Sequence, residues 1–101
     1  MAISDVQEKG SWIYIYDGNG KKSAIITGSS GELMGVGNDF IVLLKGSWYY
    51  VYDENGKKIA TITKSSGDFK NAVGNSFNLI KGSWVYTYDK KGKKINTKPN
   101  R

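Results

Sequence analysis

The sequence predicts an all-β protein built from three repeats of ~36 residues, each folded as a four-stranded antiparallel sheet. The tetrapeptide Lys-Gly-Ser-Trp occurs at residues 9–12, 45–48 and 81–84, so its spacing is 36 residues both times. The segment that follows each Trp is rich in aromatic and β-branched residues and is bounded by glycine, which is typical of strands. Self-similarity at this period indicates stacked or radially arranged sheets, none of which buries its apolar face alone.

The repeats divide a single domain, residues 1–101, into units of approximately 1–28, 29–64 and 65–101. In the complete middle unit we expect four strands, at 33–36, 40–44, 48–52 and 59–63. Because the chain starts at the second strand of its repeat, we expect 11 strands, against the 12 of three complete units. The first unit is therefore expected to lack one strand.

The turn between the third and fourth strands has the same chemistry in each unit. It begins with Asp17, Asp53 or Asp89 and ends with Gly20, Gly56 or Gly92. An Asp at the first position accepts hydrogen bonds from the turn backbone, and a Gly at the last supplies the positive φ that closes a hairpin. These segments are thus predicted to be hairpins.

One irregularity concerns register. Val36-Gly37-Asn38 recurs as Val73-Gly74-Asn75 at a spacing of 37, whereas the Trp positions stay 36 apart. A one-residue slip within a strand would move every following side chain to the other face of the sheet. The compensation indicates that the register of the third strand matters.

The third strands carry apolar residues on both faces, which predicts sheets that are covered on both sides or display an aromatic surface. We expect β-propeller-like blades, completed into a ring by oligomerisation because propellers usually need ~4 to 8 blades. A homodimer is favoured, with contacts near residues 3–27 and 77–98. The alternative is a triangular β-prism, which one chain almost closes.

Composition excludes much familiar chemistry. The chain has no His and no Cys, which removes the commonest transition-metal ligands and the Ser-His-Asp and Cys-His nucleophiles. Asp53 and Glu54 form the one adjacent carboxylate pair, but they lie in an exposed turn, and the other repeats carry Gly18 and Lys90 at the position of Glu54. We therefore expect no enzymatic activity, no catalytic residues, no metal and no cofactor.

The best candidates for a binding surface are the aromatic rows of the third strands, since Trp and Tyr offer flat apolar faces with a polar tip. Repetition at identical positions favours an inter-sheet core over a ligand platform, and both interpretations stay open. The candidate residues are Trp12, Tyr14, Tyr16, Trp48, Tyr50, Tyr52, Trp84, Tyr86 and Tyr88.

The formal net charge of +6 is concentrated in residues 73–101. A basic C-terminal third attracts phosphate, and aromatics interleaved with Lys suit single-stranded nucleic acid. This is the alternative function; the favoured one is a non-enzymatic interaction module for a protein or glycan partner. With neither a signal-peptide pattern nor an apolar stretch of ~18 residues, a cytoplasmic protein without membrane contact is expected.

Two resemblances accompany these residues. The stretch from Phe40 to Asp53 resembles the repeat of monocot mannose-binding lectins, which are β-prisms. The lectin motif Gln-x-Asp-x-Asn-x-Val-x-Tyr aligns with Leu44, Gly46, Trp48, Tyr50 and Tyr52, so the resemblance does not imply the sugar site. The whole chain is more similar to short bacterial and phage-encoded proteins with Gly-Ser-Trp-Ile-Tyr-x-Tyr-Asp-x-x-Gly-Lys-Lys-Ile repeats, a likeness that implies no activity.

Overall fold

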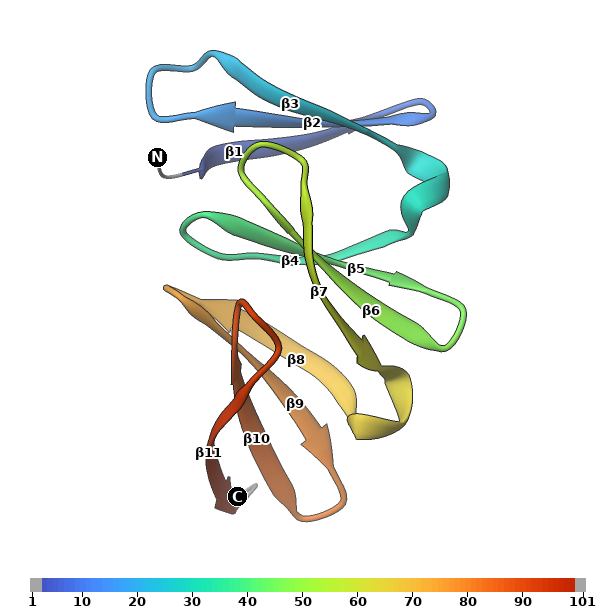
Figure 1. Cartoon of the computed structure of the whole chain (residues 1–101), viewed down its shortest axis with the longest axis vertical. Helices are drawn as coiled ribbons and strands as arrows, with labels where there is room; N and C mark the ends of the chain where they lie inside the picture. Colours follow the sequence, from blue (N-terminus) through green and yellow to red (C-terminus); the bar gives the residue numbers. More distant parts are fainter. Residues whose placement is uncertain (1–2, 100–101) are drawn as a thin grey trace.

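The computed structural model describes residues 3–99, and this part of the chain forms three antiparallel sheets in sequence order (Figure 1). The first sheet contains β1 (Ile3–Lys9), β2 (Trp12–Asp17) and β3 (Lys22–Thr27). The second contains β4 (Glu32–Val36), β5 (Phe40–Lys45), β6 (Trp48–Asp53) and β7 (Lys58–Thr63). The third contains β8 (Asp68–Val73), β9 (Ser76–Lys81), β10 (Trp84–Asp89) and β11 (Lys94–Pro99). Short 3-10 turns, Gly28–Ser30 and Lys64–Ser66, link consecutive sheets.

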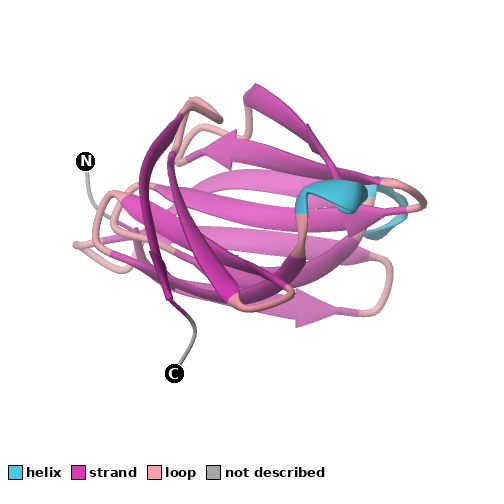
Figure 2. Ribbon diagram, turned by 90° about the horizontal axis from the view of Figure 1, so that it is seen from below, coloured by secondary structure: helices cyan, strands magenta, loops and turns pink. Residues whose placement is uncertain are grey.

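The three sheets are stacked in a row along the long axis of the molecule, whose extents are 40 × 26 × 21 Å (Figures 1 and 2). One apolar layer joins the first two sheets and includes Ile15 and Leu43. A second layer joins the last two and includes Val51 and Phe77. The predicted all-β repeat fold is thereby confirmed. The triangular prism is not the arrangement seen, because the second sheet separates the first from the third.

The turns follow the predicted chemistry. In the middle unit the Asp53 carboxylate accepts hydrogen bonds from the backbone N–H groups of Asn55 and Lys57, both at 2.9 Å. Asp17 and Asp89 accept the equivalent bonds in the other units. The closing glycine adopts a φ of 77–83° in all three turns. The hairpins therefore form for the reason that the sequence indicated.

The one-residue irregularity falls in a turn and leaves the strand register intact. Val36 pairs with Ile41 in the second sheet, and Ala72 pairs with Phe77 in the third, so the equivalent pairs are retained. Both pairs span five residues, so no residue is inserted in the third sheet. Val73 stands in the place of Gly37, extends β8 by one pair with Ser76 and leaves a shorter connection between β8 and β9. The side chains of the following strands thus keep their faces.

Each hairpin rests on the outer strand of the preceding sheet. A Cβ atom at Gly56 would lie 3.1 Å from the Ala24 side chain, and one at Gly92 would lie 3.3 Å from the Ala60 side chain. The glycines thus allow close contact between the β6–β7 turn and β3, and between the β10–β11 turn and β7. In the last unit the position of Ala60 is taken by Asn96, which is exposed.

Both end faces of the row are more polar than the inner faces. On the first sheet Asp5 and Gln7 stand where the second sheet has Ile41 and Leu43. The outer face of the third sheet carries a hydrogen-bonded polar row: Thr87 donates to Asn78 at 2.6 Å, and Asn78 donates to Asn71 at 2.7 Å. Its counterparts in the middle sheet are Val51, Val42 and Gly35. Polar outer faces on terminal repeats are typical of repeat proteins, which need them for solubility.

Candidate functional site

The aromatic rows divide into exposed and packed parts. The three Trp side chains begin β2, β6 and β10, and Trp12, Trp48 and Trp84 are 46%, 43% and 47% exposed. The expectation that repetition places them in the inter-sheet core is therefore not met in this chain. The opposite face of the same strands supplies the core, because Ile13 and Val51 are buried.

The Tyr residues at the far end of each row lie deeper. Tyr88 is half-buried and stacks on Phe77, with ring centroids 5.6 Å apart and planes inclined by 14°. Tyr52 packs against the apolar layer between the first two sheets. The structure thus brings Tyr52 and Tyr88 into the packing between sheets, while the Trp residues lie at the opposite end of the same strands.

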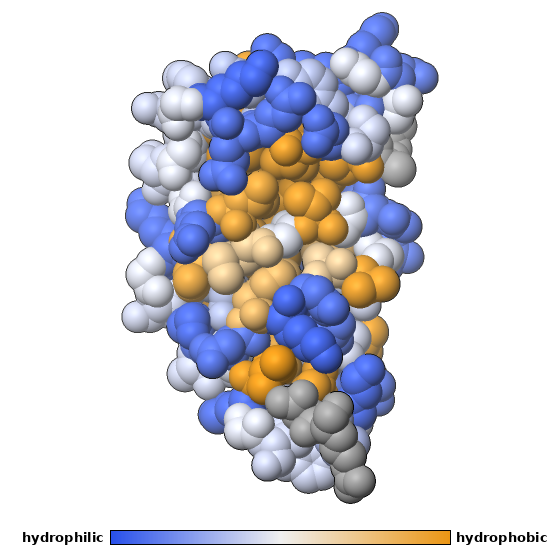
Figure 3. All heavy atoms as spheres, turned by 180° about the vertical axis from the view of Figure 1, so that it is seen from behind, coloured by the Kyte–Doolittle hydropathy of each residue, from blue (hydrophilic) through white to orange (hydrophobic). Residues whose placement is uncertain are grey.

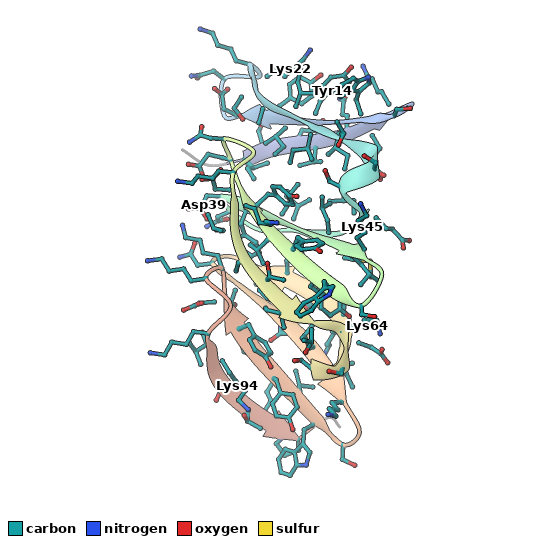
Figure 4. The ribbon with its side chains drawn as sticks, turned by 45° about the vertical axis from the view of Figure 1, so that its right-hand side comes forward. Tyr14, Lys22, Asp39, Lys45, Lys64 and Lys94 are labelled. Atoms are coloured by element: carbon teal, nitrogen blue, oxygen red, sulfur yellow. The ribbon has the colours of Figure 1, made fainter. Side chains whose placement is uncertain are left out.

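The central Tyr of each row is covered by a Lys from the neighbouring strand. The ammonium nitrogen of Lys22 lies 4.4 Å from the ring centroid of Tyr14 (Figure 4). Lys58 and Lys94 take the same position over Tyr50 and Tyr86, both at 4.8 Å. Attraction between an ammonium and an aromatic face stabilises such a pair by ~0.5–1 kcal/mol at an exposed site. Each unit therefore presents a positive charge over the centre of the row, from a Lys that lies at the hairpin end of the neighbouring strand.

A second Lys stands directly across the strand pair from each Trp. Lys9 pairs with Trp12, Lys45 with Trp48, and Lys81 with Trp84. The tight Lys-Gly-Ser-Trp turn creates this neighbourhood, and its glycine has a φ of 58–61°. We define the three Trp-Tyr-Lys sites as these clusters, in unit order: Lys9, Trp12, Tyr14 and Lys22; Lys45, Trp48, Tyr50 and Lys58; Lys81, Trp84, Tyr86 and Lys94.

The hairpin ends of the second and third sheets enclose a separate basic hollow of about 500 Å³. It is lined by Lys57, Lys58, Ile59, Lys90 and Lys91, together with Asp53 and Glu54. Lys90 is ion-paired with Asp39 at 2.5 Å, and this hydrogen bond raises the pKa of Lys90. The hollow lies at the end of the strands opposite the Trp residues.

The carboxylate of the Asp53-Glu54 turn has a structural partner. Asp53 is occupied by the backbone N–H groups of its own turn. Among residues 3–99 there is no group of three or more Asp, Glu, His or Cys side chains that could hold a metal ion. Within the same range, no helix is long and apolar enough to span a membrane.

No family model, no curated protein and no solved structure matches this chain in the three comparisons. Functional inference consequently depends on the geometry of the Trp-Tyr-Lys sites. Sequence reasoning identified their aromatic members but not the Lys that covers each Tyr. Strand pairing could have indicated this Lys. Lys58 begins β7 opposite Tyr52 and is therefore a diagonal neighbour of Tyr50.

Proposed function

We propose that this protein is a non-enzymatic binding module that holds an acidic glycan through its three Trp-Tyr-Lys sites. The observation that carries the proposal is the repeated exposure of Trp12, Trp48 and Trp84, each beside a Lys. An exposed indole offers a flat apolar face to a sugar ring, and an ammonium beside it attracts a carboxylate or sulfate group. The three indoles stand at the same position of their units and are exposed to a similar extent, which gives a ligand three comparable contacts.

The repetition of the sites favours a ligand that is itself repetitive. A protein partner generally presents an aperiodic surface, which would engage three equivalent clusters unequally. A polysaccharide presents the same group along its length, so that it engages each cluster in the same way. Linked weak sites then give an avidity well above the affinity of any one site.

The position of the lysines favours a glycan over single-stranded nucleic acid. Binding of single strands combines a basic groove with aromatic rings on which successive bases stack. In this chain the basic hollow around Lys57 and Lys91 lies at the hairpin end, and the exposed Trp residues lie at the other end of the strands. The Lys over Tyr50 also occupies a ring face that a base would need. The Lys across from each Trp thus supplies a local charge for one acidic group, whereas the larger basic hollow lies away from the exposed indoles.

The test compares the wild type with a triple variant, Trp12→Ala, Trp48→Ala and Trp84→Ala. Binding to polygalacturonate, alginate and chondroitin sulfate is measured by calorimetry, with neutral dextran and oligo-dT as competing ligand classes. We expect wild-type binding to at least one acidic polysaccharide and a loss of at least tenfold in the triple variant. Val73→Ala is the control, because Val73 is exposed but lies outside the three sites.

Three results would contradict the proposal. One is that none of the acidic polysaccharides binds. Another is that the triple variant, shown by circular dichroism to be folded, binds as tightly as the wild type. The third is that oligo-dT binds more tightly than every polysaccharide and loses affinity when Lys57 and Lys91 are changed to Gln. The last result would favour nucleic acid as the ligand.

A further inference from the structure

Among the described residues, the first sheet has three strands and each of the other two has four. β1 corresponds to β5 and β9, which are central strands paired on both sides. Within residues 3–99, β1 pairs with β2 alone, so its other edge is an edge of the sheet. The start of β1 is fixed by a hydrogen bond of 2.6 Å from the Ile3 backbone N–H to the Asn38 carbonyl oxygen. We call the place beside this edge of β1, next to β4 of the second sheet, the open position; it is one strand wide.

The second and third sheets show how the equivalent position is filled, by β4 and β8. Phe69 and Ala72 of β8 lie over Gly35 of β4, where an added Cβ would come within 2.5 Å and 3.3 Å of their atoms. Leu33 and Val36 are the equivalents of Phe69 and Ala72 one repeat earlier, and they face the open position. Val36 is 38% exposed, whereas its counterpart Ala72 is half-buried.

The lining of the open position is apolar. Val6 of β1 takes the place of Val42, against which Gly35 pairs, and Leu33 is partly buried at the edge of the first apolar layer. Figure 3 shows apolar surface along the middle of the face seen from behind, from below the top of the molecule down to the level of the third sheet. An exposed strand edge beside apolar side chains is a template for pairing with another chain.

We propose that this open position binds an extended strand from a partner protein by β-augmentation. The strand carries a bulky apolar residue followed two positions later by glycine. The filled position next to a further sheet sets this pattern: β4 reads Glu32-Leu33-Met34-Gly35-Val36, and its glycine leaves room for Phe69. β8, over which no further sheet of the described residues packs, has Asn71 in place of this glycine. A glycine opposite Val6 would leave the same room for Leu33. Main-chain hydrogen bonds to β1 give affinity, and the glycine gives selectivity.

The test uses the full chain and a synthetic peptide that copies residues 30–38, Ser-Gly-Glu-Leu-Met-Gly-Val-Gly-Asn. The matched control is the same peptide with Val in place of the glycine that copies Gly35. Binding is followed by calorimetry, by the thermal midpoint and by residue-resolved hydrogen exchange. At saturating peptide we expect the midpoint to rise by about 5 °C or more, because the ligand binds the folded state. We also expect the β1 amides to gain protection and the Val control to bind at least tenfold more weakly.

Four outcomes would overturn the proposal. In the first, the copied peptide does not bind at millimolar concentration. In the second, the Val control binds equally well, so that the Leu33 fit is irrelevant. In the third, protection appears at the edges of β3, β7 or β11 instead of at β1. In the fourth, the chain forms a dimer through β1 that the peptide does not displace, which would make a second copy the occupant. None of these outcomes depends on glycan binding.

Discussion

The ring of Phe69 occupies the space that a side chain at position 35 would need. A Cβ atom added to Gly35 would lie 2.5 Å from Cζ of Phe69, which is closer than real Cβ atoms approach other heavy atoms. Phe69 is also stacked with Phe77 at 6.3 Å and lies 6.3 Å from the Tyr49 ring, so neighbouring aromatic rings limit its movement. This contact joins β4 to β8 and sets how closely the second and third sheets approach each other.

The first prediction concerns this contact. Gly35→Ala should lower the free energy of unfolding by about 1–3 kcal/mol, because overpacking forces neighbouring side chains or strands to shift. Urea denaturation of the purified variant gives the value. Gly18→Ala is the matched control, since an added Cβ there meets no atom within 4 Å, and we expect a change of less than ~0.5 kcal/mol. Equal stability of Gly35→Ala and the wild type would refute the close packing described here.

The second prediction concerns the polar end faces. Asp5→Ile with Gln7→Leu restores the inner-face residues on the first sheet, and Asn78→Val with Thr87→Val does so on the third. We expect that a variant with only one of these pairs of changes self-associates no more than the wild type. Head-to-tail contact joins the first sheet of one molecule to the third sheet of another, so both outer faces must be apolar. Mixing the two variants should give heterodimers, and all four changes together should give open-ended polymers.

Sedimentation velocity distinguishes these species. The wild type at the same concentration is the reference. Failure of the mixture to associate would show that the polar residues do not prevent contact between the end faces.

These end faces also separate the features that the sequence alone predicts from those that it does not. The hairpin turns and the strand periods depend on local patterns, and both were predictable. The buried face of β6 was not, because both faces of this strand are apolar in the sequence. The polar caps were not predicted, because overall identity between repeats conceals the few positions at which they differ. Asp5 in place of Ile41 is such a position. The expected homodimer stays a prediction, and the polar outer faces argue against a ring closed by apolar contact.

The exposure of Trp was not predictable for a different reason. Alternation along β6 shows that Trp48 and Tyr52 share a face, but it does not show which part of that face the neighbouring sheet covers. Tyr52 packs against the apolar layer between the first two sheets, whereas Trp48, at the other end of β6, is 43% exposed. Whether a side chain on one face is buried therefore depends on inter-sheet geometry, which a repeat pattern does not contain.

The third prediction separates binding from folding at these positions. Trp48→Ala should cost about 1 kcal/mol of unfolding free energy or less, since nearly half of the side chain is already exposed. Val51→Ala should cost more, about 1–3 kcal/mol, because Val51 is fully buried and its loss leaves a cavity. Thermal denaturation followed by circular dichroism measures both. The reverse order would assign Trp48 to the structural core.

The fourth prediction concerns alkaline pH. Burial raises the pKa of Tyr49, whose hydroxyl donates to the Gly67 carbonyl at 2.9 Å, and a hydrogen bond to Asp68 raises the pKa of Lys64. The unfolded chain loses these protons at lower pH than the folded chain, so stability is retained below about pH 10 and falls as pH rises further. The pKa of Lys90 is also raised, so this residue likewise contributes stability that is lost as the pH rises.

Urea midpoints measured between pH 8 and 11.5 test this. Tyr49→Phe should be less stable than the wild type at pH 8, because the Gly67 carbonyl loses its donor, and its midpoint should fall less steeply above pH 10. A steeper fall in the variant would mean that the sign of the Tyr49 contribution is wrong.

The most direct test of glycan binding by three equivalent sites uses single-Trp variants. In each variant two of Trp12, Trp48 and Trp84 are changed to Phe, and the remaining indole is followed by fluorescence during titration with each acidic polysaccharide named above. Equivalent sites predict that all three variants respond to the same polysaccharide with midpoints within about threefold of one another. A response confined to one Trp, or no response from any of them, would contradict three equivalent binding sites.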